Sequence, residues 1–178
     1  MPTLTKVETY SLEGEKLAEM MYYGQKPLVG EEVVLWENGE VRAIIPYAHG
    51  RKHGVEKVFD EEGNLEMEIR WIKDKQGGTE VIYDDIGLKI RSSQWRDGKK
   101  HGNELFYRQN QTVWKSVEWK WGKRHGEEKE YYFQGPVKSI RLWRRNRRTG
   151  FARFYTPDGK KVSWWLHLWH EVLKIFHV

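Results

Sequence analysis

Cysteine is absent from the 178-residue sequence, which excludes disulfide bonds, thiol catalysis and zinc sites built from cysteine. Long apolar runs are missing too. Nothing approaches the roughly 18 uninterrupted apolar residues of a membrane-spanning helix, and residues 1–10 lack the apolar segment of a signal peptide. We therefore expect a cytoplasmic protein. Aromatic residues make up 14% of the chain, and because disordered chains are poor in them, a folded protein is indicated.

Charge is distributed unevenly along the chain. Residues 1–90 hold 11 lysines and arginines against 18 acidic residues, a net charge of −7, whereas residues 91–178 hold 20 against 8, a net charge of +12. Such polarity can steer a partner or pair one copy head-to-tail with another. Compositional drift of a solvated surface explains it equally well.

A period of 24 residues decides the expected fold. Five columns share it: two glycine series, a Tyr/Trp series, a Phe/Tyr series and a glutamate series. Gln111 fills the one slot that the second glycine series lacks. We assign a structural role at tight turns, where a positive φ favours glycine, to the first series: Gly30, Gly54, Gly78, Gly102, Gly126 and Gly150.

Turn signals recur about every 12 residues, which leaves no room for a helix between them. The intervening segments are rich in Val, Ile, Tyr, Phe and Trp, the residues that favour strands. We predict an all-β fold, an elongated single-sheet antiparallel meander of about six hairpins, one per 24-residue repeat. Alternation places the Phe/Tyr and glutamate columns on opposite faces, and the aromatic columns are expected to supply a thin core.

The motif Trp-x-Asn/Asp-Gly-Lys-x-His-Gly, followed by an aromatic strand and a glycine turn, resembles the MORN repeat. It is clearest in residues 119–132, and the resemblance covers residues 23–161. The glutamate after the second glycine and the 24-residue period are similar to the bacterial variant called the YwqK-type antitoxin family. The resemblance implies a hairpin-repeat fold and the neutralisation of a toxin-like protein. Gly77, Gln111 and Thr149 depart from the pattern.

The two ends differ from the repeat. Residues 1–22 are predicted to be a degenerate N-terminal hairpin or cap, residues 23–162 the MORN-like array, and residues 163–178 a short helix. We expect this helix to cap the last strand edge. Docking to a partner or to a membrane surface are alternative roles, but the single Lys174 is a poor polar face for anionic lipid. The helical stripe consists of Trp165, Leu168, Trp169, Val172 and Phe176.

The histidines do not indicate a metal site. His53, His101 and His125 share one column, whose neighbours are expected roughly 9.6 Å apart, too far for both to reach one zinc ion. We expect these rings to bond the backbone near turns. His167 and His170 have the spacing of one helix face, but no third ligand is evident. We predict no metal and no cofactor.

The periodic glutamates do not indicate catalysis. Catalytic residues are normally unique, and no nucleophile elbow or phosphate loop occurs outside the repeat. We therefore expect no enzymatic activity. A ladder of cross-strand ion pairs explains the glutamates. They are Glu32, Glu56, Glu80, Glu104 and Glu128, and the cations expected beside them are Arg51, Lys75, Lys99, Lys123 and Arg147.

Arginine and tryptophan are concentrated toward the C-terminus. Arginine suits phosphate, carboxylate and stacking contacts, and interleaved aromatic rings resemble a nucleic-acid groove. A solvated face on which arginine stems cover tryptophan rings is the structural alternative. The candidate partner-binding residues are Trp114, Trp121, Arg141, Trp143, Arg144, Arg145, Arg147, Arg148 and Arg153, followed by Lys160 and Lys161.

These patterns together favour a non-enzymatic protein that binds a macromolecule. We expect it to bind and neutralise a protein partner, as the antitoxin resemblance implies. Nucleic-acid binding through the arginine and tryptophan cluster is the alternative, and membrane-surface scaffolding is a third that the sequence disfavours. Self-association is compatible with the charge polarity.

Overall fold

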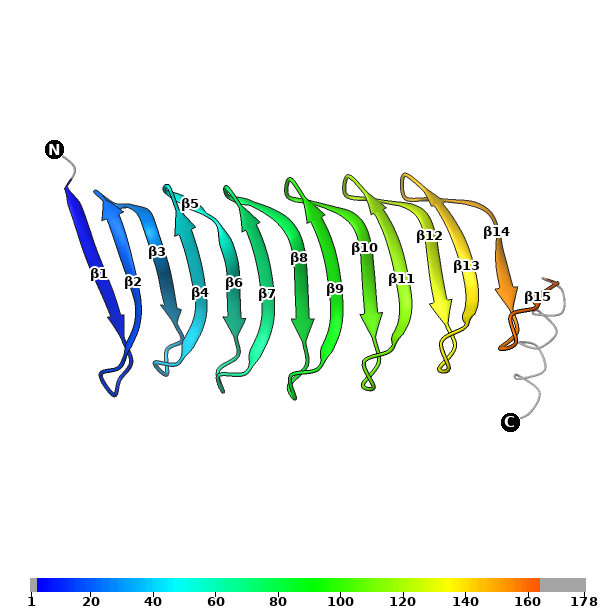
Figure 1. The fold of residues 1–178 in the computed structure, drawn as a ribbon, viewed down its shortest axis with the longest axis horizontal. Helices are drawn as coiled ribbons and strands as arrows, with labels where there is room; N and C mark the ends of the chain where they lie inside the picture. Colours follow the sequence, from blue (N-terminus) through cyan, green and yellow to red (C-terminus); the bar gives the residue numbers. More distant parts are fainter. Residues whose placement is uncertain (1–2, 164–178) are drawn as a thin grey trace. The chain divides into compact units, whose positions relative to one another are not determined.

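The computed structural model describes residues 3–163. The chain divides into two units, Met1–Lys99 and Lys100–Val178, called the N-terminal and C-terminal units below. Every element of regular secondary structure in the described residues is a β-strand (Figure 1), which confirms the predicted all-β class. The predicted helix at 163–178 falls, apart from Ser163, outside the described residues. Within residues 3–163, no helix has the length and apolar character needed to span a membrane.

The N-terminal unit is an antiparallel meander in which consecutive strands pair, in the order β1-β2-β3-β4-β6-β7-β8-β9, with the short β5 beside β4. Valine, isoleucine and aromatic residues recur along these strands because such side chains suit a pleated surface. The strands are β1 (Leu4–Tyr10), β2 (Lys16–Tyr23), β3 (Lys26–Leu35), β4 (Val41–Ala48), β5 (Arg51–Lys52), β6 (Gly54–Phe59), β7 (Leu65–Ile72), β8 (Lys75–Tyr83) and β9 (Lys89–Arg96).

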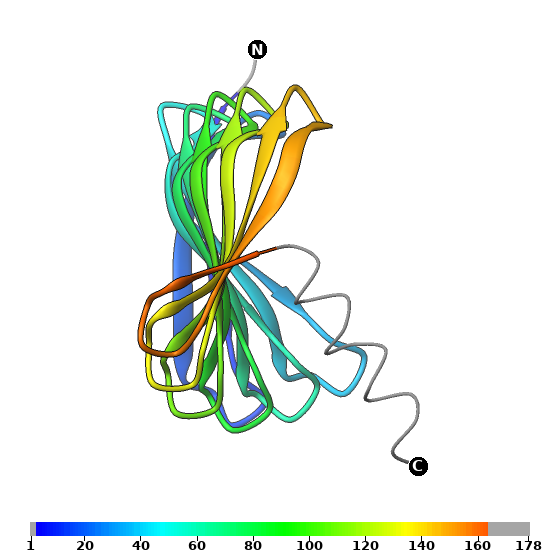
Figure 2. The ribbon, with the colours of Figure 1, turned by 90° about the vertical axis from the view of Figure 1, so that its right-hand side faces the viewer.

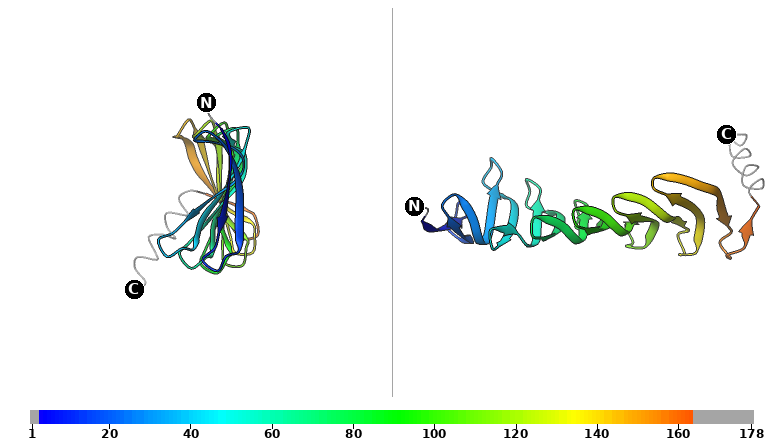
Figure 3. Two further views of the ribbon diagram at one scale, coloured as in Figure 1. Left: turned by 90° about the vertical axis from the view of Figure 1, so that its left-hand side faces the viewer. Right: turned by 90° about the horizontal axis from the view of Figure 1, so that it is seen from above.

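The C-terminal unit has the same organisation, in the order β10-β11-β12-β13-β14-β15. The predicted antiparallel meander is thus confirmed in both units. In each unit, successive strands are rotated relative to one another (Figures 2 and 3), as expected for strands of L-residues. The strands are β10 (Lys99–Tyr107), β11 (Val113–Lys120), β12 (Lys123–Tyr131), β13 (Val137–Arg144), β14 (Arg147–Tyr155) and β15 (Lys161–Val162).

Two-residue turns, called tips below, join the strands at one of their two ends. Both residues of each tip have a positive φ, such as 51° at Arg145 and 69° at Asn146. This backbone is the hairpin turn whose twist matches that of the flanking strands, and it favours Gly, Asn and Asp. The tips are His49–Gly50, Lys73–Asp74, Asp97–Gly98, Trp121–Gly122 and Arg145–Asn146.

The glycines predicted at tight turns lie within strands, which corrects that assignment. Gly126, for example, lies inside β12 with φ of 98°, where the register with β11 shifts. A positive φ at such a bulge favours glycine. Close approach adds a second requirement at Gly30, because a Cβ there would overlap the backbone carbonyl oxygen of Glu19. The remaining members, Gly54, Gly78, Gly102 and Gly150, also have a positive φ within strands.

The most buried row combines carboxylates with small side chains, so the prediction of an aromatic core is wrong. Glu104 and Glu128 are each 4% exposed, and Val117, which stands opposite both in register, is 1% exposed. The tryptophan rings of the Trp column are only half buried, as at Trp119. In a single-layer sheet, neighbouring side chains cover the middle of a face, and large rings that stand above it stay partly in water.

Candidate binding edge of the C-terminal unit

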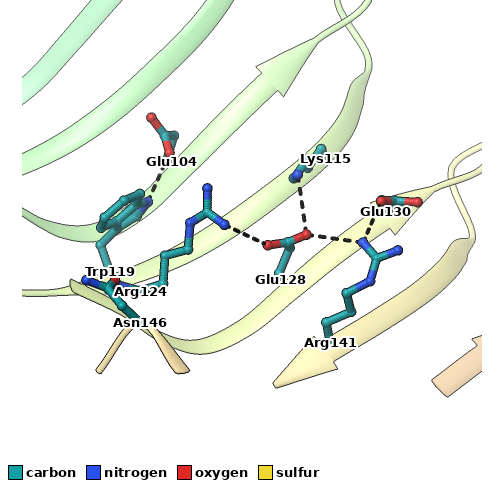
Figure 4. Close-up of polar contacts among 8 residues, drawn as sticks. All are labelled: Glu104, Lys115, Trp119, Arg124, Glu128, Glu130, Arg141 and Asn146. Carbon is teal, nitrogen blue, oxygen red and sulfur yellow. Dashed lines mark hydrogen bonds and ion pairs between the residues drawn. The ribbon is translucent and has the colours of Figure 1, made fainter. Parts of the chain in front are cut away.

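A cation, a tryptophan and a buried glutamate form a recurring group on one face. In the C-terminal unit, the Lys100 ammonium lies 5.1 Å from the centroid of the Trp119 ring and forms an ion pair with Glu104. The Trp119 Nε1–H donates a hydrogen bond to Glu104 Oε2 at 3.0 Å (Figure 4). The carboxylate therefore neutralises the cation and satisfies the indole at the same time.

The N-terminal unit repeats the grouping of cation, ring and glutamate, but Trp71 Nε1 is buried without a hydrogen-bond partner. Lys52 Nζ lies 4.8 Å from the centroid of the Trp71 ring and 3.2 Å from Glu56 Oε2. The paired cation thus precedes its glutamate by four residues, which corrects the predicted pairing of Glu56 with the neighbouring Arg51. In the C-terminal unit, Arg124 likewise replaces the expected Lys123. Residues four apart on a strand share a face, and residues five apart do not.

Glu128 contacts three cations (Figure 4). Its Oε1 lies 3.3 Å from Lys115 Nζ and 3.2 Å from Arg141 Nη1, and its Oε2 lies 3.8 Å from Arg124 Nη1. Burial raises the pKa of this carboxyl group, but the charge of Lys115 and the hydrogen bonds from Lys115 and Arg141 outweigh burial, so the pKa lies below its ordinary value. Arg141 also contacts Glu130 at 2.9 Å.

The tip between β13 and β14 carries arginine on both flanks. Arg144 stands directly opposite Arg147 in register, and Arg145 is the first residue of the turn. Like charges placed directly opposite destabilise an antiparallel pair. The next residue, Arg148, lies over the Trp143 ring with its guanidinium 5.4 Å from the centroid. Within residues 3–163, none of these four exposed arginines forms an ion pair: Arg144, Arg145, Arg147 and Arg148.

The adjacent tip, between β11 and β12, adds further positive charge. Lys120 stands opposite Lys123 in register, and Trp121 at the turn is 45% exposed. The two tips are joined, because Asn146 N–H donates to Arg124 O at 3.0 Å and Arg124 N–H donates to Asn146 Oδ1 at 2.7 Å. We call the resulting surface the basic edge; it comprises Lys120, Lys123, Arg124, Arg144, Arg145, Arg147 and Arg148.

The ring of His101 packs edge-on against Trp121, with centroids 4.6 Å apart, and its Nδ1 is buried without a hydrogen-bond partner. The expectation that this histidine bonds the backbone is therefore wrong. The His101 ring instead packs against the exposed Trp121 side chain. In the described part of the chain, no three His, Asp or Glu side chains are grouped closely enough to hold a metal ion.

The structure gathers some of the predicted partner-binding residues and separates others. Trp114 lies near the start of β11, far along the strand from the basic edge, with its ring 5.8 Å from Phe106. Arg153 forms an ion pair with Glu127 at 3.5 Å, and Arg141 is held by Glu128. The residues that meet at the two tips are Trp121, Trp143, Arg144, Arg145, Arg147 and Arg148.

Sequence reasoning missed three members of the basic edge: Lys120, Lys123 and Arg124. The 24-residue period could have identified them. It aligns Lys120-Trp-Gly-Lys-Arg124 with Arg144-Arg-Asn-Arg-Arg148 one repeat later. Counting residues 100–163, the C-terminal unit has 16 lysines and arginines against 6 acidic residues, a net charge of +10. Residues 3–99 have 14 against 19, a net charge of −5.

Cations cover the tryptophan rings beside the basic edge. The Arg124 and Arg148 guanidinium carbons lie 5.0 Å and 5.4 Å from the centroid of the Trp143 ring. Trp119 similarly has Lys100 at 5.1 Å and Arg124 at 5.8 Å. Rings that already stack on cations are poor platforms for nucleic-acid bases. What these groups present to solvent is the guanidinium, which suits carboxylate and phosphate oxygens.

Comparison with known families matches residues 52–73 to the MORN repeat variant. The matched segment runs from Lys52 through β6 and β7 to the tip residue Lys73, so it spans one complete hairpin of the N-terminal unit. The resemblance to a MORN repeat variant is thus confirmed for this segment. A search of curated proteins gave no match.

Proposed function

We propose that the chain is a non-enzymatic binding protein, an array of about six MORN-like hairpins whose basic edge holds an acidic region of a protein partner. The observation that carries the proposal is the tip at 144–147, where Arg144 and Arg147 stand opposite each other with no ion pair in the described residues. An acidic partner would supply the negative charge that this hairpin lacks.

The composition of this tip is not required by the fold. The equivalent tip of the N-terminal unit places Asp74 where the C-terminal unit has Asn146, and both side chains accept the same backbone hydrogen bond. A carboxylate is therefore compatible with the turn and would relieve the repulsion between the arginines. Departures from local consistency that carry a cost are typical of functional surfaces.

An acidic protein fits the edge better than a nucleic acid does. Base stacking needs accessible ring faces, and the rings of Trp119 and Trp143 are covered by cations. Arginine presents a planar fork that bonds a carboxylate in a bidentate manner. The resemblance to YwqK-type antitoxins supports the further proposal that the partner is toxin-like and is neutralised by binding.

The decisive experiment titrates the protein with a fluorescent deca-glutamate peptide and with random single-stranded DNA and RNA at low and physiological salt. We expect micromolar binding of the peptide, lost when Arg144, Arg145, Arg147 and Arg148 are all replaced by Gln. Replacing four cations of the N-terminal unit controls for net charge and should leave binding intact. These control positions are Arg51, Lys57, Lys73 and Lys75.

Nucleic-acid binding is the second candidate, because Trp121 is an exposed ring beside the basic edge. Phosphate-driven binding weakens steeply with salt, with a log–log slope of roughly −0.9 per neutralised phosphate for duplex DNA. Submicromolar, salt-steep binding of DNA or RNA that needs the same four arginines would replace the acidic protein with a nucleic acid as the partner. Binding that vanishes near physiological salt would leave the proposal in place.

The toxin-neutralising role is tested in cells. The open reading frame next to this gene should arrest growth when it is expressed alone, and co-expression of the wild-type chain should restore growth. The variant lacking the four arginines should fail to restore it, whereas the N-terminal control variant should succeed. A neighbouring gene product that does not affect growth, or rescue by both variants, would contradict the role.

A further inference from the structure

A carboxylate follows the stacked cation by four residues in three copies of the recurring group. The pairs are Lys52 with Glu56, Lys100 with Glu104, and Arg124 with Glu128. In the copy nearest the C-terminus the cation is Arg148, which lies over Trp143, and the residue four positions later is Ala152. Arg148 thus shares the Trp143 ring with Arg124 of the preceding copy, and the slot 19 residues after it holds His167, which lies outside the described residues. This copy therefore keeps a cation on a tryptophan ring but lacks the acidic side chain.

A buried hydroxyl group lies on the same face as Ala152. Ser139 is 2% exposed, and its Oγ is buried without a hydrogen-bond partner. Ser139 stands opposite Phe154 in register, and Phe154 and Ala152 are two residues apart on β14, so all three share a face. One repeat earlier, Lys115 occupies the slot of Ser139 and contacts the glutamate of its neighbour strand at 3.3 Å.

The strand that carries Ala152 is accessible along much of its length. β14 pairs with β15 only through Phe154 and Tyr155. Its earlier residues, Arg147 to Arg153, have β13 on one side and no strand of the described residues on the other. Residues 147–151 are exposed, so a segment of a partner can approach Arg148 along β14.

We propose that an Asp or Glu side chain of the partner fills the position beside Ala152, with its carboxylate accepting hydrogen bonds from the Arg148 guanidinium and the Ser139 hydroxyl. The partner would thus supply in trans the carboxylate that the other copies supply with their own glutamate. This subsite rests on the proposed function of the basic edge, and it adjoins that edge at Arg148 as a place where a carboxylate is recognised individually. Charge complementarity and the unpartnered hydroxyl support the assignment.

The substitution Ala152→Glu tests the subsite, because it supplies the missing carboxylate in cis. We expect a higher Tm, since Arg148 and Ser139 gain an acceptor, and a roughly tenfold weaker affinity for fluorescent deca-glutamate, the loss expected for one charge-assisted hydrogen bond. Thr149→Glu is the matched control: it makes the same charge change three residues away on the opposite face. It should weaken peptide binding less than about twofold.

A second variant keeps the test independent of how Ala152→Glu folds. Arg148→Gln, at an exposed position, should also weaken peptide binding about tenfold, and the two substitutions combined should cost no more than either alone. Additive losses, a lower Tm for Ala152→Glu, or equal losses for Ala152→Glu and Thr149→Glu would each overturn the subsite. Glu171 is the one acidic side chain in the sequence after Asp158. A tenfold gain in affinity for Glu171→Gln would assign the position to a carboxylate of this chain and likewise overturn the assignment to a partner.

The outcomes separate the subsite from the function on which it rests. If deca-glutamate binds and the variant lacking four arginines does not, the basic edge is a binding surface whatever Ala152→Glu does. If deca-glutamate fails to bind the wild-type protein, the proposed function and the subsite both fail. Peptide binding that is insensitive to Ala152→Glu contradicts the subsite alone.

Discussion

The hairpin ends at 72–75 and 144–147 have the same turn conformation but differ in charge. Asp74 Oδ1 accepts a hydrogen bond from Lys52 N–H at 2.8 Å, and Asn146 Oδ1 accepts one from Arg124 N–H at 2.7 Å. The N–H groups of Asp74 and Asn146 both donate back to those residues at 3.0 Å. These two turns use a side-chain oxygen and a positive φ, and both Asp and Asn supply them, whereas the other tips have glycine at this position. Charge at the tips is therefore set independently of the fold.

The buried glutamates show the same contrast. Glu56 in the N-terminal unit pairs with Lys52, whereas Glu128 in the C-terminal unit is contacted by Lys115, Arg124 and Arg141. Both carboxylates occupy the same slot and are nearly fully buried. In the C-terminal unit, few buried carboxylates offset an excess of positive charge. Each of them should therefore matter more for stability than a buried carboxylate of the N-terminal unit.

The largest expected effect comes from removing the Glu128 charge. Glu128→Gln leaves three cations around a neutral amide and should lower the free energy of unfolding by about 3–4 kcal/mol, because the charge-assisted hydrogen bonds from Lys115 and Arg141 are weakened together. Glu56→Gln removes one partner of one lysine and should cost about 1 kcal/mol. Urea unfolding of both variants measures the difference. Equal losses would show that the number of surrounding cations does not matter.

Glycine substitutions give the next largest effects. They compare the atoms that a new Cβ would meet in the two units. Gly30→Ala should cost about 3 kcal/mol, because its Cβ meets backbone at a position of positive φ. Gly126→Ala should cost about 2 kcal/mol, because its obstacle is the mobile Glu118 carboxylate. Gly135→Ala, at a turn with nothing within 4 Å, should cost about 1 kcal/mol. A reversed order in thermal unfolding would contradict the assigned contacts.

Acid should weaken the C-terminal unit through Glu128. Its pKa is lower in the folded protein than the ordinary 4.5, so the carboxylate contributes stability above that pH, and the contribution is lost as pH falls through the folded pKa. Urea midpoints measured from pH 7 down to pH 3 should therefore converge for the wild type and Glu128→Gln. Parallel curves across the whole range would show that this carboxyl group is not perturbed.

The smallest effect is expected from exchanging Asp and Asn at tip positions 74 and 146. Asn146→Asp keeps the oxygen that accepts from Arg124 and adds a carboxylate among arginines, so it should raise the free energy of unfolding by about 0.5 kcal/mol. Asp74→Asn should lower it by a similar amount or less, since Arg51 lies 3.9 Å from the carboxylate. A loss of stability for Asn146→Asp, or a gain for Asp74→Asn, would mean that these tips depend on more than an oxygen and a positive φ.

The sequence was sufficient to predict the hairpins, because a 24-residue period with turn signals twice per period admits no helix. It did not distinguish the tip glycine from the bulge glycine. Gly98 and Gly102 both have a positive φ, at 73° and 105°, and glycine is the expected residue at either position. Only the strand register separates them. Alternation alone predicts the cation four residues before Glu56, Glu104 and Glu128. It does not predict the cross-strand pair of Glu80 with Arg91.

The binding edge was less accessible to prediction. Counting arginines identified Arg144, Arg145, Arg147 and Arg148, whose exposure follows from their place at a tip. The same count included Arg153, whose ion pair with Glu127 depends on a residue 26 positions earlier. Such pairings depend on which residues face one another across strands, and composition carries no information about that.

Each tip of the C-terminal unit bonds backward along the chain: Gly122 N–H donates to Lys100 O at 2.9 Å, and Asn146 N–H donates to Arg124 O at 3.0 Å. The acceptor always lies 22 residues earlier, so it leaves the ribosome before its donor. Translation at roughly 5–20 residues per second needs seconds for one repeat, whereas a hairpin forms in roughly 1–10 μs. Each hairpin can therefore close on a strand already in place, and a nascent chain exposes one unfinished repeat at a time.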